Sequence, residues 1–221
     1  MLSKYRNRDI SRLEGFSDAV FAFAATLLVV SLQVPSSFSE LISQLYGFFG
    51  FAVTFGALVA IWTVHNAFFR RYAMTDGWTV FLNSALLFVV LFYVFPLKFL
   101  TDSGVGAIGL GDSVVRLESW DELRQIFILY SAGFGAVFLC VSLLYIHAWR
   151  SRQVLGLTPE AAWEAAMLAR HYLLFVVVSL LSIAIAVAGI GIRFGLPGLA
   201  YILLGPLCFA QGAWSERFRP H

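Results

Sequence analysis

The stretch from Arg12 to Val34 reads RLEGFSDAVFAFAATLLVVSLQV, and it decides the fold class of this chain. From Ala19 onward the stretch is apolar apart from three uncharged polar side chains. A helix needs about 20 predominantly apolar residues to cross a bilayer, so we expect this stretch to span a membrane. It is too long for the apolar region of a signal peptide, and no small-residue cleavage site follows it. We therefore expect the chain to retain it.

The composition of the whole chain agrees with a membrane protein. Of its 221 residues, 60% are hydrophobic and 13% are charged, and the mean hydropathy is +0.82. A soluble domain has about 45–50% apolar and about 25% charged residues. A soluble enzyme, a disordered chain and a disulfide scaffold are therefore excluded. The formal charge of +2 is too small to predict a nucleic-acid partner.

Six apolar stretches are long enough to span a bilayer. They cover about residues 12–34, 41–69, 78–100, 123–149, 168–190 and 195–214. Backbone groups cannot stay unpaired in lipid, and the stretches lack the alternation of a transmembrane barrel, so we expect helices. Thr158 and Pro159 form a helix start, which predicts that the fifth helix begins before its span. The sequence thus predicts an all-α integral membrane protein, with residues 1–221 forming one six-helix domain.

The basic residues predict how these helices are oriented. Eleven of the 15 lysines and arginines fall at one set of helix ends, and four fall at the other. The four are Lys98, Arg116, Arg124 and Arg193. Because basic residues accumulate on the cytoplasmic side, we expect both termini in the cytoplasm, as an even number of spans requires. The chain is thus predicted to be a multi-pass protein in the lipid bilayer of the cell membrane.

The first helix has two distinct faces. Ser11 and Glu14 predict a capping box, so the helix begins near Arg12. At 100° per residue, one stripe holds Arg12, Phe16, Ala19, Phe23, Thr26, Leu27 and Val30. Asp18 lies well away from this stripe, and Ser17 lies off it on the other flank. A carboxylate costs about 2.5–3.5 kcal/mol at the centre of a membrane helix. Asp18 lies nearer the inner end but still needs a polar partner, so we expect it to point into the subunit.

The second helix offers partners for this carboxylate. Trp62, His65 and Asn66 share one face near its inner end, and His65 and Asn66 lie at the depth of Asp18. An indole, an imidazole and an amide can satisfy a buried carboxylate and a serine hydroxyl. In the third helix, Asn83 is expected to form an interhelical hydrogen bond, and Pro96 is expected to kink or end the helix.

Three interpretations of Asp18 and His65 remain open at this stage. The first is a structural polar clamp. The second is a proton-coupled secondary transporter that uses both residues, because a histidine beside a carboxylate can titrate near neutral pH. The third is a catalytic set with Ser17, which is disfavoured because adjacent side chains point about 100° apart on a helix. The first helix has no glycine or proline between Asp18 and Val34, which favours a channel over a transporter with broken helices.

These residues resemble the transmembrane protein 175 family of potassium channels. The resemblance is carried by Arg12-x-x-x-Phe16-Ser17-Asp18, the following Ala-Val-Phe-Ala, Thr26-Leu27-Leu28, Trp62-x-x-His65, Asn83 and Phe95-Pro96. It covers the first three helices, about half of the chain. The remaining helices match the family only in number and hydropathy.

The resemblance implies a potassium-selective channel without a P-loop filter, not an enzyme. It implies that first helices surround the ion path, and that the Phe-Ser-Asp residues hold them through polar contacts with the second helix. A chain with one copy of the motif would form a homotetramer around a central pore. The implied permeant species is the potassium ion. No cofactor is implied, and no metal site beyond transient potassium ions in the pore.

The resemblance also implies a layered hydrophobic constriction. By position it consists of Phe23, Leu27 and Val30, with the hydroxyl of Thr26 beside it. A ring of apolar side chains narrower than a hydrated ion holds no water column, so it can act as a gate by dewetting. The family usually has Ile or Leu where this chain has Phe23, and a phenyl ring either narrows the axis or turns a π-face to a cation.

Overall fold

The computed structural model describes residues 11–30, 36–107 and 119–218, and all of its regular elements are helices. The elements are α1 (Arg12–Val30), α2 (Phe38–Tyr72), α3 (Gly77–Ala107), α4 (Trp120–Arg150), α5 (Pro159–Val187), η2 (Ile192–Phe194), α6 (Leu196–Leu199), η3 (Ala200–Leu203) and α7 (Leu204–Glu216). Within the described residues, six segments are long and apolar enough to cross a membrane. The sequence-based prediction of an all-α protein with six spans is confirmed.

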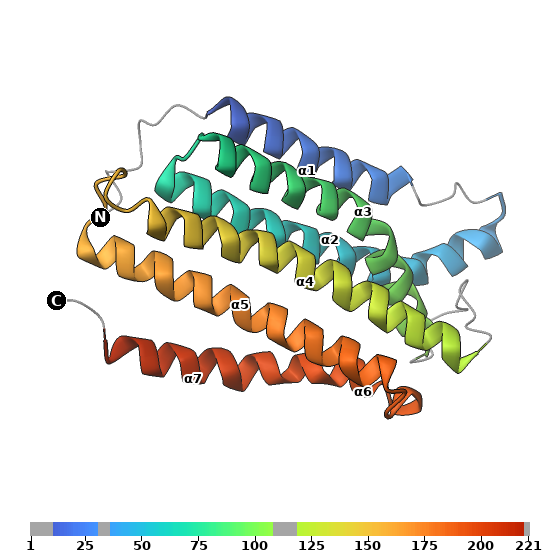
Figure 1. Cartoon of the computed structure of the whole chain (residues 1–221). Coiled ribbons are helices and arrows are strands. Elements are labelled where there is room, and N and C mark those ends of the chain that lie inside the picture. Colours follow the sequence, from blue (N-terminus) through green and yellow to red (C-terminus); the bar gives the residue numbers. More distant parts are fainter. Residues whose placement is uncertain (1–10, 31–35, 108–118, 219–221) are drawn as a thin grey trace.

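Several helices extend beyond their apolar stretches. α2 begins at Phe38, and α5 begins at Pro159, where the Thr158 side chain accepts a hydrogen bond from the backbone N–H of Ala161. α3 runs through Pro96 to Ala107, so the proline does not end this helix, which bends toward its C-terminal end (Figure 1). Residues 31–34, predicted to complete the first span, lie outside the described residues. The length of an apolar stretch identifies a membrane span, whereas capping and tertiary contacts determine where the helix begins and ends.

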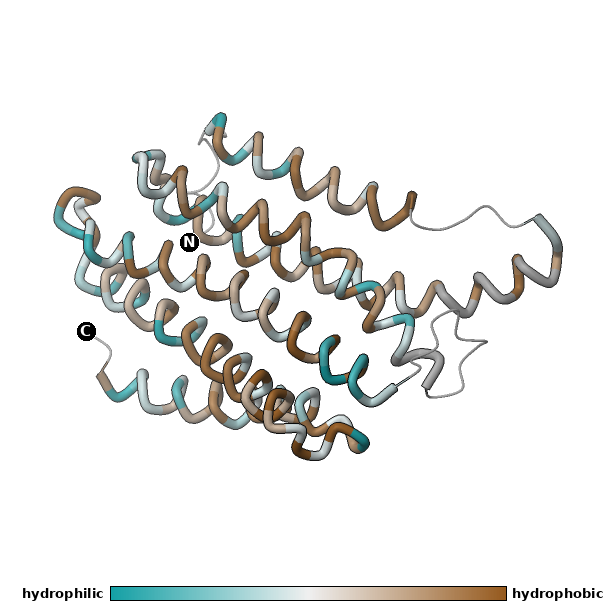
Figure 2. The backbone as a smooth tube through the Cα atoms, turned by 45° about the vertical axis from the view of Figure 1, so that its right-hand side comes forward, coloured by the Kyte–Doolittle hydropathy of each residue, from teal (hydrophilic) through white to brown (hydrophobic). Residues whose placement is uncertain are grey.

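The helices lie side by side in one elongated bundle. Figure 1 shows α1 at one edge of the molecule and α7 at the other, with α4 and α5 packed along each other between them. α1 packs against α2 and α3, and α7 packs against α5. Figure 2 shows hydrophobic residues along the helices and hydrophilic residues gathered toward their ends. This distribution fits a bundle whose middle lies in lipid.

Two polar contacts join helices at the end of the bundle where α1 begins. The guanidinium of Arg71 on α2 makes a bidentate ion pair with Glu164 on α5. Asp76 caps α3 by accepting from the backbone N–H of Trp78, and His147 on α4 lies 3.0 Å from the same carboxylate oxygen. Partial burial raises the pKa of Asp76, but hydrogen bonds from Thr79 and His147 outweigh it and hold the pKa below its ordinary value. The carboxylate form of Asp76 is thereby favoured.

Close helix packing around α4 depends on glycine. A Cβ atom added at Gly133 would lie 2.2 Å from the ring of Tyr93 on α3, and one added at Gly135 would lie 2.3 Å from the hydroxyl of Ser179 on α5. Small residues of this kind let membrane helices approach closely, and van der Waals packing then stabilises the contact. α4 is therefore held against both of its neighbours.

We expect the Gly133→Ala variant to be less stable than the parent protein. The added methyl must displace the buried ring of Tyr93, and overpacking of this kind costs about 1–3 kcal/mol. Thermal unfolding of the purified protein in detergent measures the effect. Gly205→Ala on α7 is the matched control, because no atom lies within 4 Å of its added Cβ and alanine is the better helix former. Equal loss of stability in both variants would contradict the packing argument.

Candidate functional site

One narrow face of α1 is buried within the chain. Its buried residues are Ser17, Phe21, Ala24 and Leu28. Their spacing of four, three and four residues places them on a single side of the helix. This side packs against α2 and α3, its flanks are half-buried, and the opposite side of α1 is exposed in the described part of the chain.

The residues predicted to form a constriction lie away from this buried face. Phe23 is 56% exposed and Val30 is 72% exposed, and Thr26 is exposed while Leu27 is half-buried. The hydroxyl of Thr26 donates to the backbone carbonyl of Ala22 at 3.0 Å. The stripe predicted from the sequence is therefore available for contacts outside the single chain. Its role in a pore remains a prediction.

A chain of buried hydrogen bonds joins α1, α2 and α3. The Asn83 amide nitrogen donates to Ser17 Oγ at 2.9 Å, and the Asn83 amide oxygen lies 2.8 Å from His65 Nε2. All three side chains are at most 2% exposed. Asn83 on α3 is thus the central member of the network, linking the serine of α1 to the histidine of α2.

The direction of each hydrogen bond in this network follows from Ser17. Its hydroxyl proton goes to the carbonyl of Leu13 at 2.8 Å, so Ser17 Oγ accepts from Asn83. The amide oxygen of Asn83 must then face His65, and Nε2 of His65 must carry a proton. Nδ1 of His65 is buried and has no partner among the described residues. A second proton on the ring would therefore have no acceptor, which favours a neutral imidazole.

Of the three partners expected for Asp18, the structure provides one, the indole of Trp62. The Asp18 carboxylate accepts a hydrogen bond from Trp62 Nε1 at 2.8 Å, but it is exposed in the single chain and does not point into the subunit. The expected contacts of Asp18 with His65 and Asn66 are absent, since His65 bonds Asn83. The physical reason is helical geometry: Ser17 occupies the buried face, and the next residue points about 100° away.

The remaining predicted members of the network lie outside it. Arg12 is exposed, and so is Phe16. Asn66 is half-buried and makes no side-chain hydrogen bond to any described residue. The sequence analysis expected an interhelical hydrogen bond from Asn83 but did not include this residue in the site. The signal that identifies it is an amide side chain in a helix that is otherwise apolar at that depth.

This geometry limits the chemistry that the site can perform. Ser17 and His65 are linked only through Asn83, and Asp18 bonds Trp62, so the three do not form a catalytic relay. The separate partners of Asp18 and His65 also argue against a direct proton relay between them. Among residues 11–30, 36–107 and 119–218, no three His, Cys, Asp or Glu side chains are grouped to bind a metal ion. The site is a structural junction that presents an unpartnered helix face.

Comparison with known proteins finds a relative that matches most of the chain and others that match part of it. The family model for "Endosomal/lysosomal potassium channel TMEM175" matches residues 12–93, which contain α1, α2 and Asn83. A potassium channel of Marivirga tractuosa is 34% identical over 96% of this chain and 90% of its own length. A potassium channel of Chamaesiphon minutus is 32% identical over 46% of this chain and 54% of its own length.

Solved structures share the fold. A variant of the potassium channel MtTMEM175, in complex with a nanobody fusion protein, has a TM-score of 0.83 at 32% identity and covers 96% of each chain. A homolog, from Chamaesiphon minutus, of the lysosomal potassium-selective channel TMEM175 has a TM-score of 0.62 at 23% identity. It covers 90% of this chain and 96% of its own, and at that identity the likeness shows the fold alone.

We expect Asn83→Leu to destabilise the folded chain by about 1–2 kcal/mol, because it leaves the buried groups of Ser17 and His65 unpaired. The thermal midpoint of the purified protein in detergent should fall by a few degrees. Asn66→Leu is the matched control and should shift the midpoint much less. A larger effect at Asn66 than at Asn83 would show that the network described above is not the one that stabilises the protein.

Proposed function

This chain belongs to the TMEM175 family of potassium channels, and on that premise we propose that it is a potassium-selective channel whose pore is lined by α1 of four copies. The proposed pore has no P-loop filter. Its narrowest part is a hydrophobic constriction of Phe23, Leu27 and Val30, with Thr26 beside them. The permeant species is the potassium ion, and the channel needs no cofactor.

The single observation that carries this proposal is the incomplete coverage of α1. The helix buries one face against its own chain and leaves both an apolar stripe and the carboxylate of Asp18 exposed. Exposure of a carboxylate to lipid is costly, so α1 requires a neighbour other than lipid. Copies of the same chain around a central axis provide that neighbour, and four copies enclose a pore.

The two exposed features of α1 lie on different sides of the helix. Around the helix axis, Asp18 lies about 90° from the middle of the buried face in one direction. Phe23 and Val30 lie on the far side of the helix in the opposite direction. One copy can therefore place Asp18 and Trp62 against a neighbouring subunit while its apolar stripe faces the axis. This arrangement separates the polar contacts of assembly from the surface that ions pass.

The proposed pore is closed when its apolar constriction holds no water and opens when water enters the constriction. An apolar ring narrower than a hydrated ion excludes water, and a small rotation of α1, with α2 and α3 moving together with it, would retract Leu27 and Val30 and turn Thr26 toward the axis. The Thr26 proton is used by Ala22, which leaves oxygen lone pairs of the hydroxyl available to a cation. Potassium sheds hydration water more readily than sodium, so a narrow and poorly coordinating passage favours potassium modestly.

The positions of the basic residues support the proposed orientation. Arg12, Arg71, Arg150 and Arg217 lie at the end of the bundle where α1 begins. We therefore propose that this end is cytoplasmic and that the chain is a multi-pass protein of the cell membrane.

We expect purified protein in a planar bilayer, with potassium on one side and sodium on the other, to give a reversal potential shifted toward the potassium equilibrium potential. Leu27→Ala and Val30→Ala should increase the leak current and reduce the potassium preference, because each widens the constriction. Val29→Ala is the matched control, since Val29 is exposed at the same depth but off the stripe. Unchanged currents in Leu27→Ala, or saturable flux that depends on a proton gradient, would contradict the proposal.

We expect Asp18→Ala to reduce the amount of tetramer while leaving the single chain folded. The substitution leaves Trp62 Nε1 without its acceptor at the proposed subunit contact. Native mass spectrometry of the detergent-solubilised protein measures the oligomer, and circular dichroism checks the helical content. Ser17→Ala serves as the comparison, because it should lower thermal stability more than it alters assembly. A normal tetramer with changed ion selectivity would mean that Asp18, rather than the apolar stripe, faces the pore.

A further inference from the structure

A pocket opens at the end of the bundle opposite the start of α1. It has a volume of about 520 Å³ and lies between the first turn of α4 and the turn that joins α5 to α6. Trp120 begins one membrane span, and residues 188–195 separate two others. The pocket is therefore at the boundary between the apolar part of the bundle and water.

Glycine residues shape the turn that forms one wall of this pocket. Gly191 and Gly195 flank η2 in the left-handed conformation, with φ of 60° and 66°. Ile192 is buried against Phe127 of α4, which attaches the turn to the bundle. The tight turn directs Arg193 outward beside the first turn of α4.

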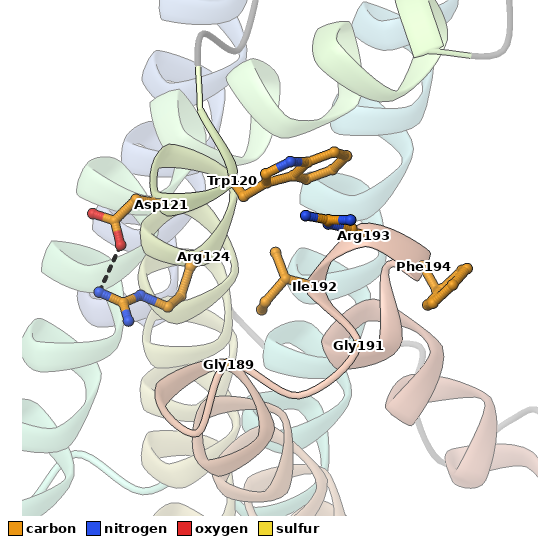
Figure 3. A pocket seen from close by; sticks show the side chains of 8 residues that line it. All are labelled: Trp120, Asp121, Arg124, Gly189, Gly191, Ile192, Arg193 and Phe194. Atoms are coloured by element: carbon orange, nitrogen blue, oxygen red, sulfur yellow. Dashed lines mark ion pairs between the residues drawn. The ribbon is translucent and has the colours of Figure 1, made fainter.

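Two guanidinium groups and one carboxylate line the pocket. Arg193 lies beneath the indole of Trp120, with its guanidinium carbon 5.6 Å from the ring centroid (Figure 3). No described residue accepts a hydrogen bond from Arg193 or pairs with its charge. Arg124 pairs through Nη2 with Asp121 at 2.7 Å, but its Nε atom is buried without a partner among the described residues. The residues that line the pocket thus carry unsatisfied donors and two positive charges against one negative charge.

Basic residues are scarce at this end of the bundle, so the presence of two of them in one pocket suggests a role for the pocket. Of the three described ones, Lys98 is paired with Asp102 at 2.6 Å, and the other two are Arg124 and Arg193 in the pocket. A planar guanidinium presents forked donors that suit a phosphate group. Stacking on Trp120 holds one of these groups in place while leaving its N–H edge open.

Apolar side chains also belong to this turn. Phe194, which lines the pocket, is 82% exposed, and Ile190, between the lining residues Gly189 and Gly191, is 56% exposed. An aromatic side chain at the membrane boundary and an exposed aliphatic side chain in the same turn suit a ligand that carries hydrocarbon as well as a phosphate. Free phosphate satisfies the arginines but leaves these side chains in water.

We propose that this pocket binds the phosphate group of an anionic phospholipid. Arg193 donates to the phosphate oxygens, Arg124 supplies the second positive charge, and Phe194 contacts the glycerol and acyl region. The net charge of the two arginines and Asp121 favours an anionic headgroup over a zwitterionic one. The site lies at the opposite end of the bundle from the Ser17, Asn83 and His65 network, and its occupancy does not depend on ion conduction.

The test is lipid binding to the purified protein after its co-purified lipids have been exchanged for detergent. Native mass spectrometry follows the addition of phosphatidylglycerol, with phosphatidylcholine and inorganic phosphate as separate arms. We expect one tight phosphatidylglycerol per chain and weaker binding of phosphatidylcholine. Arg193→Gln should weaken the tight binding at least about tenfold, because a hydrogen bond to a charged group is worth a factor of roughly ten to one hundred.

Arg152→Gln is the matched control, because Arg152 also lies over a tryptophan, 4.9 Å from the ring centroid of Trp149, but in a different part of the chain. It should change the affinity by less than twofold. Arg193→Lys keeps the charge without the planar fork and should lose less affinity than Arg193→Gln. Equal binding by Arg193→Gln and Arg152→Gln would overturn the site, and displacement of phosphatidylglycerol by an equal concentration of inorganic phosphate would overturn the lipid as its ligand.

Discussion

The hydrogen-bond chain from Ser17 through Asn83 to His65 is the constraint on which the arrangement of the first three helices depends. In an apolar surrounding an unpaired polar group is costly, so these three side chains bond one another inside the protein, and Nδ1 of His65 lacks a partner among the described residues. Once the Ser17 proton goes to Leu13, only one orientation of the Asn83 amide and one protonated nitrogen of His65 complete the chain. The rotation of α1 about its own axis is thereby determined, and Phe21 packs on the same side as Ser17.

Because α1 is attached to its own chain by a single face, different sides of the helix can serve different roles. The buried face holds the helix in its own chain, while its outward-facing sides remain available to other surfaces. Asp18 is stabilised by Trp62 of the same chain, so its carboxylate is not alone before assembly. The apolar stripe that includes Phe23 has no such partner within the described residues. A helix with these properties can change its outer contacts without breaking its inner ones.

In the second half of the chain, hydroxyl groups and small residues join neighbouring helices, together with aromatic rings packed between α4 and α5. Ser142 on α4 donates to the carbonyl of Ala169 on α5, and Ser131 and Ser182 lie within hydrogen-bond distance of each other across the same pair of helices. Ser182 also donates to the carbonyl of Pro197, which ties α6 to α5. These contacts and the close approach at Gly135 make α4 and α5 a frame against which α3 packs.

The sequence by itself determined the fold class, the six spans and the capping of α1, in which Ser11 Oγ accepts a hydrogen bond from the backbone N–H of Glu14. It also identified Trp62 as one of the possible partners of Asp18. Apolar length and helical periodicity are local properties, so a single chain read residue by residue contains them. Only the tertiary structure decided that Ser17 rather than Asp18 faces inward. Periodicity relates the faces of a helix to one another but does not say which face meets a neighbour. The same limit applies to the pocket beside Arg193, whose two walls are about 70 residues apart in the sequence and meet only because α4 and α5 pack along their length.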